Sequence, residues 1–269
     1  MSPLRVAAAG ALAAAAAFGA QRALTSTVRS PRWERTNHAG EPVTLLEGPS
    51  YVAGAAVGAV AAGPAGVVAV LGSGAFGALD DLAGDGASKG LKGHLGAAAR
   101  GEVTTGFVKV VGIGATGLVS AALADRPRDD VGGLDTLVGG AVVAGAANLA
   151  NLLDLRPGRA LKATALASLP LLLGSSRSAA LGAAAATGAA LGVAAPDLAG
   201  RSMLGDTGAN AAGALVGTAL LGATGRRGRL VALAVLTALT LASEKVSFTR
   251  VIESTPVLRE LDAWGRPAR

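Results

Sequence analysis

The sequence predicts an all-α fold: a polytopic membrane bundle of about nine transmembrane helices, with the N-terminus outside and the C-terminus in the cytoplasm. Composition is the first reason for this prediction. Of 269 residues, 51% are hydrophobic and 16% are charged, well below the roughly 25% charge of a soluble domain. The chain also contains 40 glycines and only 3% aromatic residues, with a mean hydropathy of +0.50. Small residues let membrane helices pack closely but make a poor core for a water-soluble enzyme.

Nine apolar runs account for the predicted helices, although several are shorter than the roughly 17–25 residues of a full membrane crossing. In order they are Leu4–Ala20, Val43–Ala62, Ala65–Leu79, Thr105–Ala124, Leu134–Leu153, Ala163–Leu173, Ala179–Ala195, Ala209–Ala223 and Leu230–Ala242. The first run has features of a secretory signal peptide, but we expect it to be retained because the sequence downstream is equally membrane-like. We expect one integral-membrane domain over residues 1–269, with a motif-bearing core at 43–248 and a cytoplasmic tail at 249–269.

Lysine and arginine positions predict the orientation, because cytoplasmic loops are enriched in both. With the N-terminus outside, sixteen of the 24 basic residues fall inside, seven fall outside, and Lys109 lies within a run. The cluster of Arg226, Arg227 and Arg229 falls outside and does not fit the rule. We attribute the net charge of +6 to cytoplasmic loops rather than to nucleic-acid binding. We expect a multi-pass protein of the plasma membrane. The absence of Cys excludes disulfides and thiol nucleophiles.

Four aspartates fall at the predicted cytoplasmic ends of the runs: Asp80, Asp81, Asp154 and Asp206. Acidic residues can simply mark where a helix meets water. However, a helix C-terminus is unfavourable for anions, and adjacent carboxylates repel each other unless a cation intervenes. Mg²⁺ typically binds one or two carboxylates together with phosphate oxygens and water. The pattern therefore favours a metal–phosphate site at this face.

Two further motifs lie at the same face. Asn148, Asn151 and Asp154 recur at a spacing of three and share one helix face, either lining a polar cavity or bonding to a neighbouring helix. Three basic residues suited to phosphate, or to the ordinary cytoplasmic charge bias, follow: Arg156, Arg159 and Lys162. The second motif is Gly205-Asp206-Thr207-Gly208, whose glycines allow close backbone approach and whose Thr can cap a helix. A simple capped turn is the alternative. Lys109, within a run, is expected to pair with the carboxylates.

Together these motifs resemble the polyprenyl-phosphate N-acetylhexosamine-1-phosphate transferases (glycosyltransferase family 4). This family includes phospho-MurNAc-pentapeptide transferase and its UDP-GlcNAc-using relatives. Asp80-Asp81 is similar to the family's paired aspartates, and Lys89-Gly90-Leu91 to the Lys-Gly-Leu that follows them. The Asn148–Asp154 and Leu204–Gly208 segments match the Asn-x-x-Asn-x-x-Asp and Gly-Asp-Thr-Gly motifs. The resemblance runs from about residue 36 to the C-terminus and indicates a divergent, short member.

The resemblance implies a specific reaction at the cytoplasmic face. A polyprenyl phosphate attacks the β-phosphate of a UDP-(N-acetyl)amino sugar and yields a lipid-linked pyrophosphate sugar and UMP, with Mg²⁺ required and Mn²⁺ as a substitute. Asp206 and Asp154 would bind the metal, Asp80 or Asp81 would deprotonate or orient the lipid phosphate, and Asp154 would assist at the pyrophosphate. The residues implied in substrate binding are Lys89, Asn148, Asn151, Arg156 and Thr207.

Departures from the family pattern keep other functions open. Where the family commonly has a second Asp in a Gly-Leu-Asp-Gly run, this sequence has Leu155-Arg156-Pro157-Gly158. Met203-Leu204 stands in place of the aromatic residue that often precedes the family's Gly-Asp-Thr-Gly motif. The last loop lacks the family's histidine cluster. A catalytically altered or inactive member that acts as a membrane scaffold in cell-envelope synthesis is one alternative. Another intramembrane Mg²⁺–pyrophosphate enzyme, such as a prenyltransferase, is a second, and a transporter is a third. Small-residue helix faces are compatible with a homodimer.

Overall fold

The computed structural model describes residues 2–37, 40–83 and 104–267. These residues form eleven α-helices, one 3-10 helix and a two-stranded sheet, which confirms the all-α class. The elements in chain order are α1 (Pro3–Thr27), η1 (Pro31–Trp33), β1 (Glu34–Thr36), β2 (Pro42–Thr44), α2 (Glu47–Ala59), α3 (Pro64–Ala83), α5 (Thr105–Asp125), α6 (Gly133–Leu153), α7 (Arg159–Leu173), α8 (Arg177–Leu198), α9 (Gly205–Ala223), α10 (Arg226–Ser243), α11 (Phe248–Ser254) and α12 (Pro256–Ala263).

Each of the nine predicted runs coincides with one helix, from α1 to α3 and from α5 to α10. The boundaries differ most at α2, because Val43 and Thr44 belong to β2, which pairs antiparallel with β1. The split between the second and third runs is confirmed, since α3 begins at Pro64, a residue that fits the first turn of a helix.

Five helices among the described residues are long and apolar enough to cross a membrane: α1, α3, α5, α6 and α8. A sixth span is obtained if α10 and α11, bent by 94° at their junction, are counted together. The prediction of about nine transmembrane helices is therefore supported only in part. The 13 residues of α2 rise about 20 Å, less than the roughly 30 Å hydrocarbon core. Polar residues at the starts of α9 and α10 lower their hydropathy.

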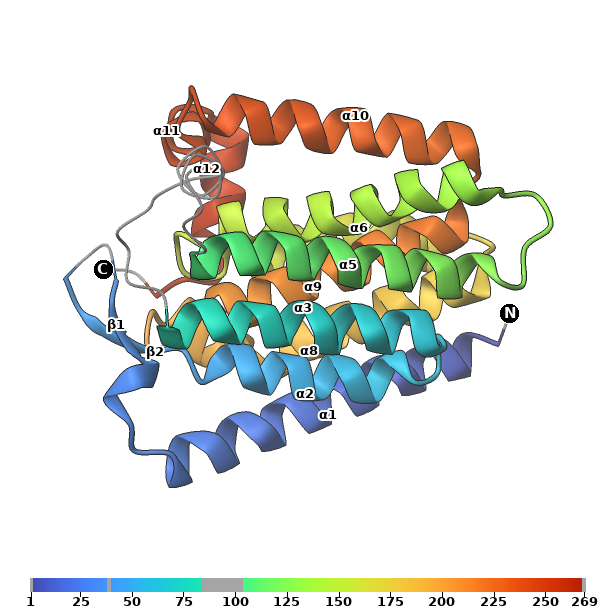
Figure 1. The fold of residues 1–269 in the computed structure, drawn as a ribbon. Helices are drawn as coiled ribbons and strands as arrows, with labels where there is room; N and C mark the ends of the chain where they lie inside the picture. The colour runs from blue at the N-terminus through green and yellow to red at the C-terminus, as the bar shows by residue number, and fades with distance from the viewer. Residues whose placement is uncertain (1, 38–39, 84–103, 268–269) are drawn as a thin grey trace.

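The long helices run roughly side by side around α9 (Figure 1), which packs against α2, α3, α5, α6, α7 and α8. Its small residues make this close packing possible, and most of its length is buried. One end of the bundle contains the β1–β2 hairpin (Figure 1). The same end contains the starts of α2, α5, α7 and α9 and the ends of α3, α6 and α8. We call this the hairpin end.

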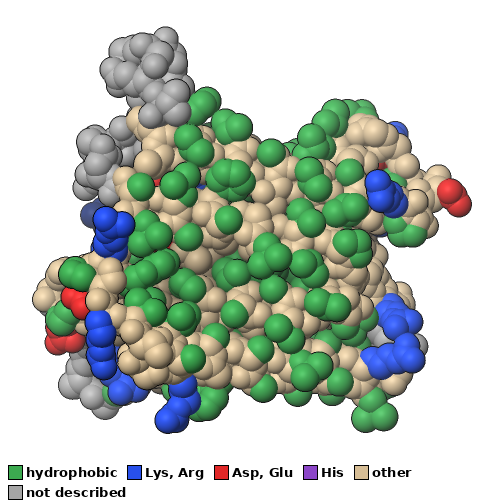
Figure 2. Space-filling model, turned by 60° about the horizontal axis from the view of Figure 1, so that its bottom comes forward, with side chains coloured by type: hydrophobic (Ala, Val, Ile, Leu, Met, Phe, Trp, Pro, Cys, Tyr) green, Lys and Arg blue, Asp and Glu red, His purple; other side chains and the backbone are tan. Residues whose placement is uncertain are grey.

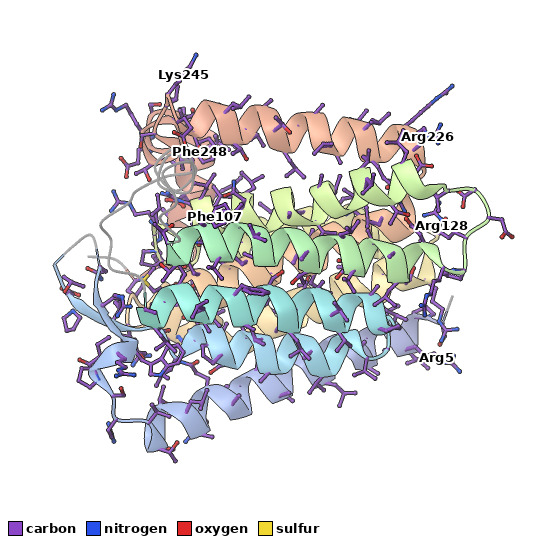
Figure 3. All side chains as sticks on the ribbon, in the orientation of Figure 1. Arg5, Phe107, Arg128, Arg226, Lys245 and Phe248 are labelled. Atoms are coloured by element: carbon purple, nitrogen blue, oxygen red, sulfur yellow. The ribbon has the colours of Figure 1, made fainter. Side chains whose placement is uncertain are left out.

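Charged side chains gather at the two ends of the bundle. On the face drawn in Figure 2, hydrophobic side chains cover the middle and Lys and Arg lie toward the two sides. Figure 3 shows Arg5, Arg128 and Arg226 at one end and Lys245 at the hairpin end. An apolar belt between two charged margins is the surface expected of a membrane protein.

The Arg226–Arg229 cluster, which does not fit the predicted orientation, is held by acidic partners. The Arg229 side chain is fully buried, and its Nη2 and Nη1 lie 2.5 and 2.8 Å from the two Asp125 carboxylate oxygens. The Arg226 Nε lies 2.6 Å from the Asp135 Oδ1. These two arginines therefore join α10 to α5 and α6, which gives them a structural reason to lie at this end.

Candidate functional site

Three charged side chains from three helices meet at the hairpin end. The Lys109 ammonium of α5 donates to the Asp80 Oδ2 of α3 at 2.6 Å and also to the Asp206 Oδ2 of α9. About a fifth of each side chain is exposed. The expected pairing of Lys109 with the carboxylates is confirmed. Its ammonium relieves the repulsion between the two carboxylates.

Asp81 faces a different partner, the first turn of α9. Its Oδ1 accepts from the Asp206 backbone N–H at 3.0 Å, and its Oδ2 accepts from the Thr207 N–H at 2.8 Å and the Thr207 hydroxyl at 2.6 Å. A carboxylate at a helix N-terminus satisfies free N–H groups and interacts favourably with the helix dipole. Asp81, at the unfavourable end of its own helix, thus lies at the favourable end of another, and Thr207 points toward Asp81.

The start of α9 reaches these aspartates because two glycines allow it. Gly205 has a left-handed φ of 59°, a conformation that glycine adopts at little cost. A side chain at Gly77 of α3 would collide with the backbone of Asp206 and Thr207. The backbones of α3 and α9 therefore touch one turn before Asp80 and Asp81. The Gly-Asp-Thr-Gly motif is a close junction between two helices as well as a source of polar groups.

Asp154, just beyond the end of α6, is 6% exposed. Burial raises the pKa of this carboxyl well above its ordinary value, and the negative charges of Asp197, Asp206 and Asp81 raise it further. Within the described residues, its buried Oδ2 has no hydrogen-bond partner. Asp154 also lines a cavity of about 200 Å³. The structure thus brings Asp154 close enough to the other aspartates for their charges to act on it, and one of its oxygens is buried without a hydrogen-bond partner among the described residues.

The sequence analysis missed two buried acidic residues at the same end, Glu47 and Asp197, which are 0% and 1% exposed. Ser202 donates its hydroxyl hydrogen bond to Glu47, and the Gly158 N–H donates to the Asp197 Oδ1 at 2.9 Å. Asp197 lines the same cavity as Asp154. It follows the seventh apolar run by two residues, so the criterion that selected the other aspartates could have found it. Glu47 lies inside an apolar run, where composition alone hides it.

The other predicted substrate-binding residues have different surroundings, and one of them, Arg156, lines the same cavity as Asp154. The Asn148 amide donates to the Thr240 hydroxyl of α10 at 3.1 Å, which is the helix–helix bond that the sequence allowed as an alternative. Asn151 is half-buried, and the Arg156 guanidinium lies 3.2 Å from a carboxylate oxygen of Glu253. Lys89 lies outside the described residues.

The site offers a limited set of ligands to a metal ion. Within residues 2–37, 40–83 and 104–267, no three acidic or histidine side chains are grouped so that they could hold an ion by themselves. Mg²⁺ commonly needs only one or two carboxylates, with water and substrate phosphates completing its shell. Asp206 and the unpartnered oxygen of Asp154 are donors of that kind.

Comparison with known proteins adds no family to this geometry. No protein-family model matches the chain, and no curated protein matches it either.

Proposed function

We propose that the protein transfers a phospho-sugar from a UDP-(N-acetyl)amino sugar to a polyprenyl phosphate at the cytoplasmic face of the plasma membrane. The observation that carries this proposal is the meeting of Asp80, Lys109 and Asp206 at one end of an apolar bundle, where the buried Asp154 feels the charge of Asp206. Phosphoryl transfer depends mainly on positioning and charge neutralisation. Carboxylates and an ammonium at a membrane end supply both functions.

The division of contacts suggests a role for each aspartate. Asp80 accepts a proton from the lipid phosphate or orients it, because its carboxylate is partly exposed. Asp81 uses both oxygens to hold the start of α9, so we assign it to positioning rather than to proton transfer. The lipid phosphate oxygen then forms a bond to the β-phosphorus, the bond to the α-phosphate breaks, and UMP leaves. Lys109 neutralises part of the phosphate charge.

A divalent cation would complete this site. Asp206 and Asp154 would hold Mg²⁺, because they offer the two carboxylates that the ion commonly takes and Asp154 has an oxygen without a partner among the described residues. When bound, the ion would neutralise charge on the donor diphosphate. Asp80 would remain available for the lipid phosphate.

An apolar groove supports a lipid acceptor. It has a volume of about 320 Å³ and lies between α6, α7, α9 and α10, with Leu149, Leu153, Leu171, Val216 and Leu236 among its lining residues. Leu153 immediately precedes Asp154 in the chain. A prenyl chain in this groove would therefore have its phosphate near the acidic cluster.

The decisive experiment combines purified protein, undecaprenyl or decaprenyl phosphate, Mg²⁺ and a panel of UDP-sugars, and measures UMP release. We expect UMP with at least one amino-sugar donor. Asp80→Asn should lower turnover by roughly 10²–10⁴-fold, the usual range for a lost acid–base group, and Asp206→Asn should lower turnover because it removes a carboxylate that would hold the metal ion. Asp130→Asn is the matched control, because Asp130 lies in the loop after α5, outside the acidic cluster, and its side chain is 63% exposed. Chelation of the metal should abolish turnover in the unmodified protein.

Two results would overturn the proposal: no UMP with any donor, or equal turnover by the Asp80 and Asp206 variants and the unmodified protein. The first result would favour a membrane scaffold that has kept the helix arrangement without the chemistry. Release of pyrophosphate from a prenyl diphosphate instead of UMP would favour the prenyltransferase alternative.

A further inference from the structure

The C-terminal helices α11 and α12 fold back onto the start of α7. The Arg159 guanidinium, 5% exposed, binds both Asp262 carboxylate oxygens, at 2.7 and 3.0 Å. The Lys162 ammonium donates to the backbone oxygens of Asp262 and Trp264, at 2.5 and 3.1 Å. The Arg266 Nε donates to the Pro157 carbonyl at 2.8 Å. The basic residues that the sequence suggested for phosphate therefore anchor the C-terminal segment.

This anchoring encloses a groove of about 390 Å³ between α7 and α12. Its walls are apolar and include Leu166 and Leu169 of α7, Leu258 and Leu261 of α12, and Trp264. All five side chains are 40% exposed or more. The chain bends by 94° between α10 and α11, so α11 runs across the direction of the bundle. Apolar side chains and a terminal Trp on such a segment are typical of a helix at a membrane interface.

One end of the groove carries a positive charge. Arg159 and Lys162 line the groove together with Asp262, and Arg266 also pairs with Asp262 at 2.9 Å. Arg159 and Arg266 thus share the Asp262 carboxylate, whereas the Lys162 ammonium bonds to backbone oxygens, so positive charge is in excess at this end of the groove. Basic pockets beside membrane helices attract anionic lipid head groups. An apolar groove with a cationic end is complementary to a lipid with an anionic head.

We propose that this groove binds one anionic phospholipid of the surrounding bilayer, with an acyl chain against α7 and α12 and the head group beside Lys162 and Arg159. The site adjoins the groove between α6, α7, α9 and α10, which we assign to the acceptor, and both grooves are lined by Leu153 and Ala163. The proposal does not depend on enzymatic activity. The bound lipid would link the C-terminal segment to the composition of the membrane.

Trp264 provides a local probe for this site. The chain has two Trp residues, so Trp33→Phe leaves Trp264 as the only one. The variant is placed in phosphatidylcholine nanodiscs that contain increasing fractions of phosphatidylglycerol or phosphatidylcholine with brominated acyl chains, and Trp264 quenching is measured. We expect phosphatidylglycerol to quench at a several-fold lower mole fraction than phosphatidylcholine.

Three substitutions in this background test the location. Lys162→Gln removes a positive charge that would attract the lipid head group, and Ala165→Phe fills the groove without changing the residues of the ion pairs. Each substitution should abolish the preference for phosphatidylglycerol. Ala167→Phe is the control, because Ala167 lines the other groove, and the preference should remain. Equal quenching by the two lipids, or a preference that survives both Lys162→Gln and Ala165→Phe, would overturn the proposal. So would competition by unlabelled decaprenyl phosphate but not by unlabelled phosphatidylglycerol, which would identify the occupant as the acceptor.

Discussion

At the scale of single residues, two neighbouring aspartates have different partners. Asp80 faces the Lys109 ammonium, whereas Asp81 accepts three hydrogen bonds from the first turn of α9. Consecutive helical residues point in directions about 100° apart, so one pair of carboxylates serves two different neighbours. The sequence could not distinguish their roles, because a pair of adjacent aspartates looks the same whichever one meets α9.

This difference predicts two phenotypes. Asp81→Asn should lower the free energy of unfolding by about 0.5–2 kcal/mol, the usual cost of a lost helix cap, because an amide cannot accept all three hydrogen bonds. Asp80→Asn should leave stability nearly unchanged while it lowers turnover. Thermal unfolding in detergent, measured beside UMP release, checks both. A stable, inactive Asp81→Asn variant together with an active Asp80→Asn variant would reverse our assignment.

At the scale of elements, the site depends on a close contact between α3 and α9. Gly77 is the position where the two backbones touch, and Asp80 and Asp81 follow it within little more than one turn. Without this contact, Asp81 could not reach the N–H groups of Asp206 and Thr207. The sequence contains the glycine, but among 40 glycines nothing local identifies it as the contact.

Gly77→Ala should therefore be destabilising. A methyl group there would collide with the α9 backbone, which cannot move without displacing Asp206, and overpacking of this kind typically costs 1–3 kcal/mol. Gly114→Ala in α5 is the matched control, because a side chain there would meet no atom within 4 Å. This control should be neutral or slightly stabilising, since Ala favours a helix over Gly. Equal unfolding temperatures for the two variants would contradict the close contact.

Docking of α12 should depend on pH. Burial raises the pKa of Asp262, but the hydrogen bonds and charge of Arg159, with the charge of Arg266, outweigh it and hold the pKa below its ordinary value. A lowered pKa in the folded state stabilises docking above the ordinary Asp value of about 3.9, and the contribution is lost as pH falls through the lowered pKa. Trp264 emission in the Trp33→Phe background should report release of α12 at acidic pH. Asp262→Asn should already be released at neutral pH.

At the scale of the whole molecule, the two ends of the bundle differ in kind. The hairpin end contains a partly exposed acidic cluster around one lysine, whereas the other end contains closed Arg–Asp pairs such as Arg229–Asp125. The buried Arg229–Asp125 pair has little charge left to bind a ligand, so we assign the proposed chemistry to the hairpin end. The orientation follows from the counts of Lys and Arg, and remains a prediction.

Single cysteines test that orientation, because the chain has none of its own. Arg227→Cys and Arg250→Cys are suitable, since both positions are exposed; Arg227 is the second residue of α10, and Arg250 lies beyond the opposite end of that helix. In intact cells, a membrane-impermeant maleimide should label Arg227→Cys, while Arg250→Cys should react only after permeabilisation. The reverse labelling pattern would mean that the membrane orientation is the opposite of the predicted one and that the acidic cluster faces the outside.

The sequence by itself determined the all-α fold class of this protein. The apolar runs predicted the helices, and their polar ends selected Asp80, Asp81, Asp154 and Asp206, because hydropathy and charge act locally and can be counted along a chain. Only the tertiary structure decided the partners. It joined Lys109 to Asp80 and Asp206, assigned Asp81 to the start of α9, and buried Glu47 and Asp197 beside Asp154. It also paired Arg159 and Lys162 with Asp262 of α12. Such contacts depend on how helices distant in sequence pack together, and in a chain of small residues many packings share the same pattern of hydropathy.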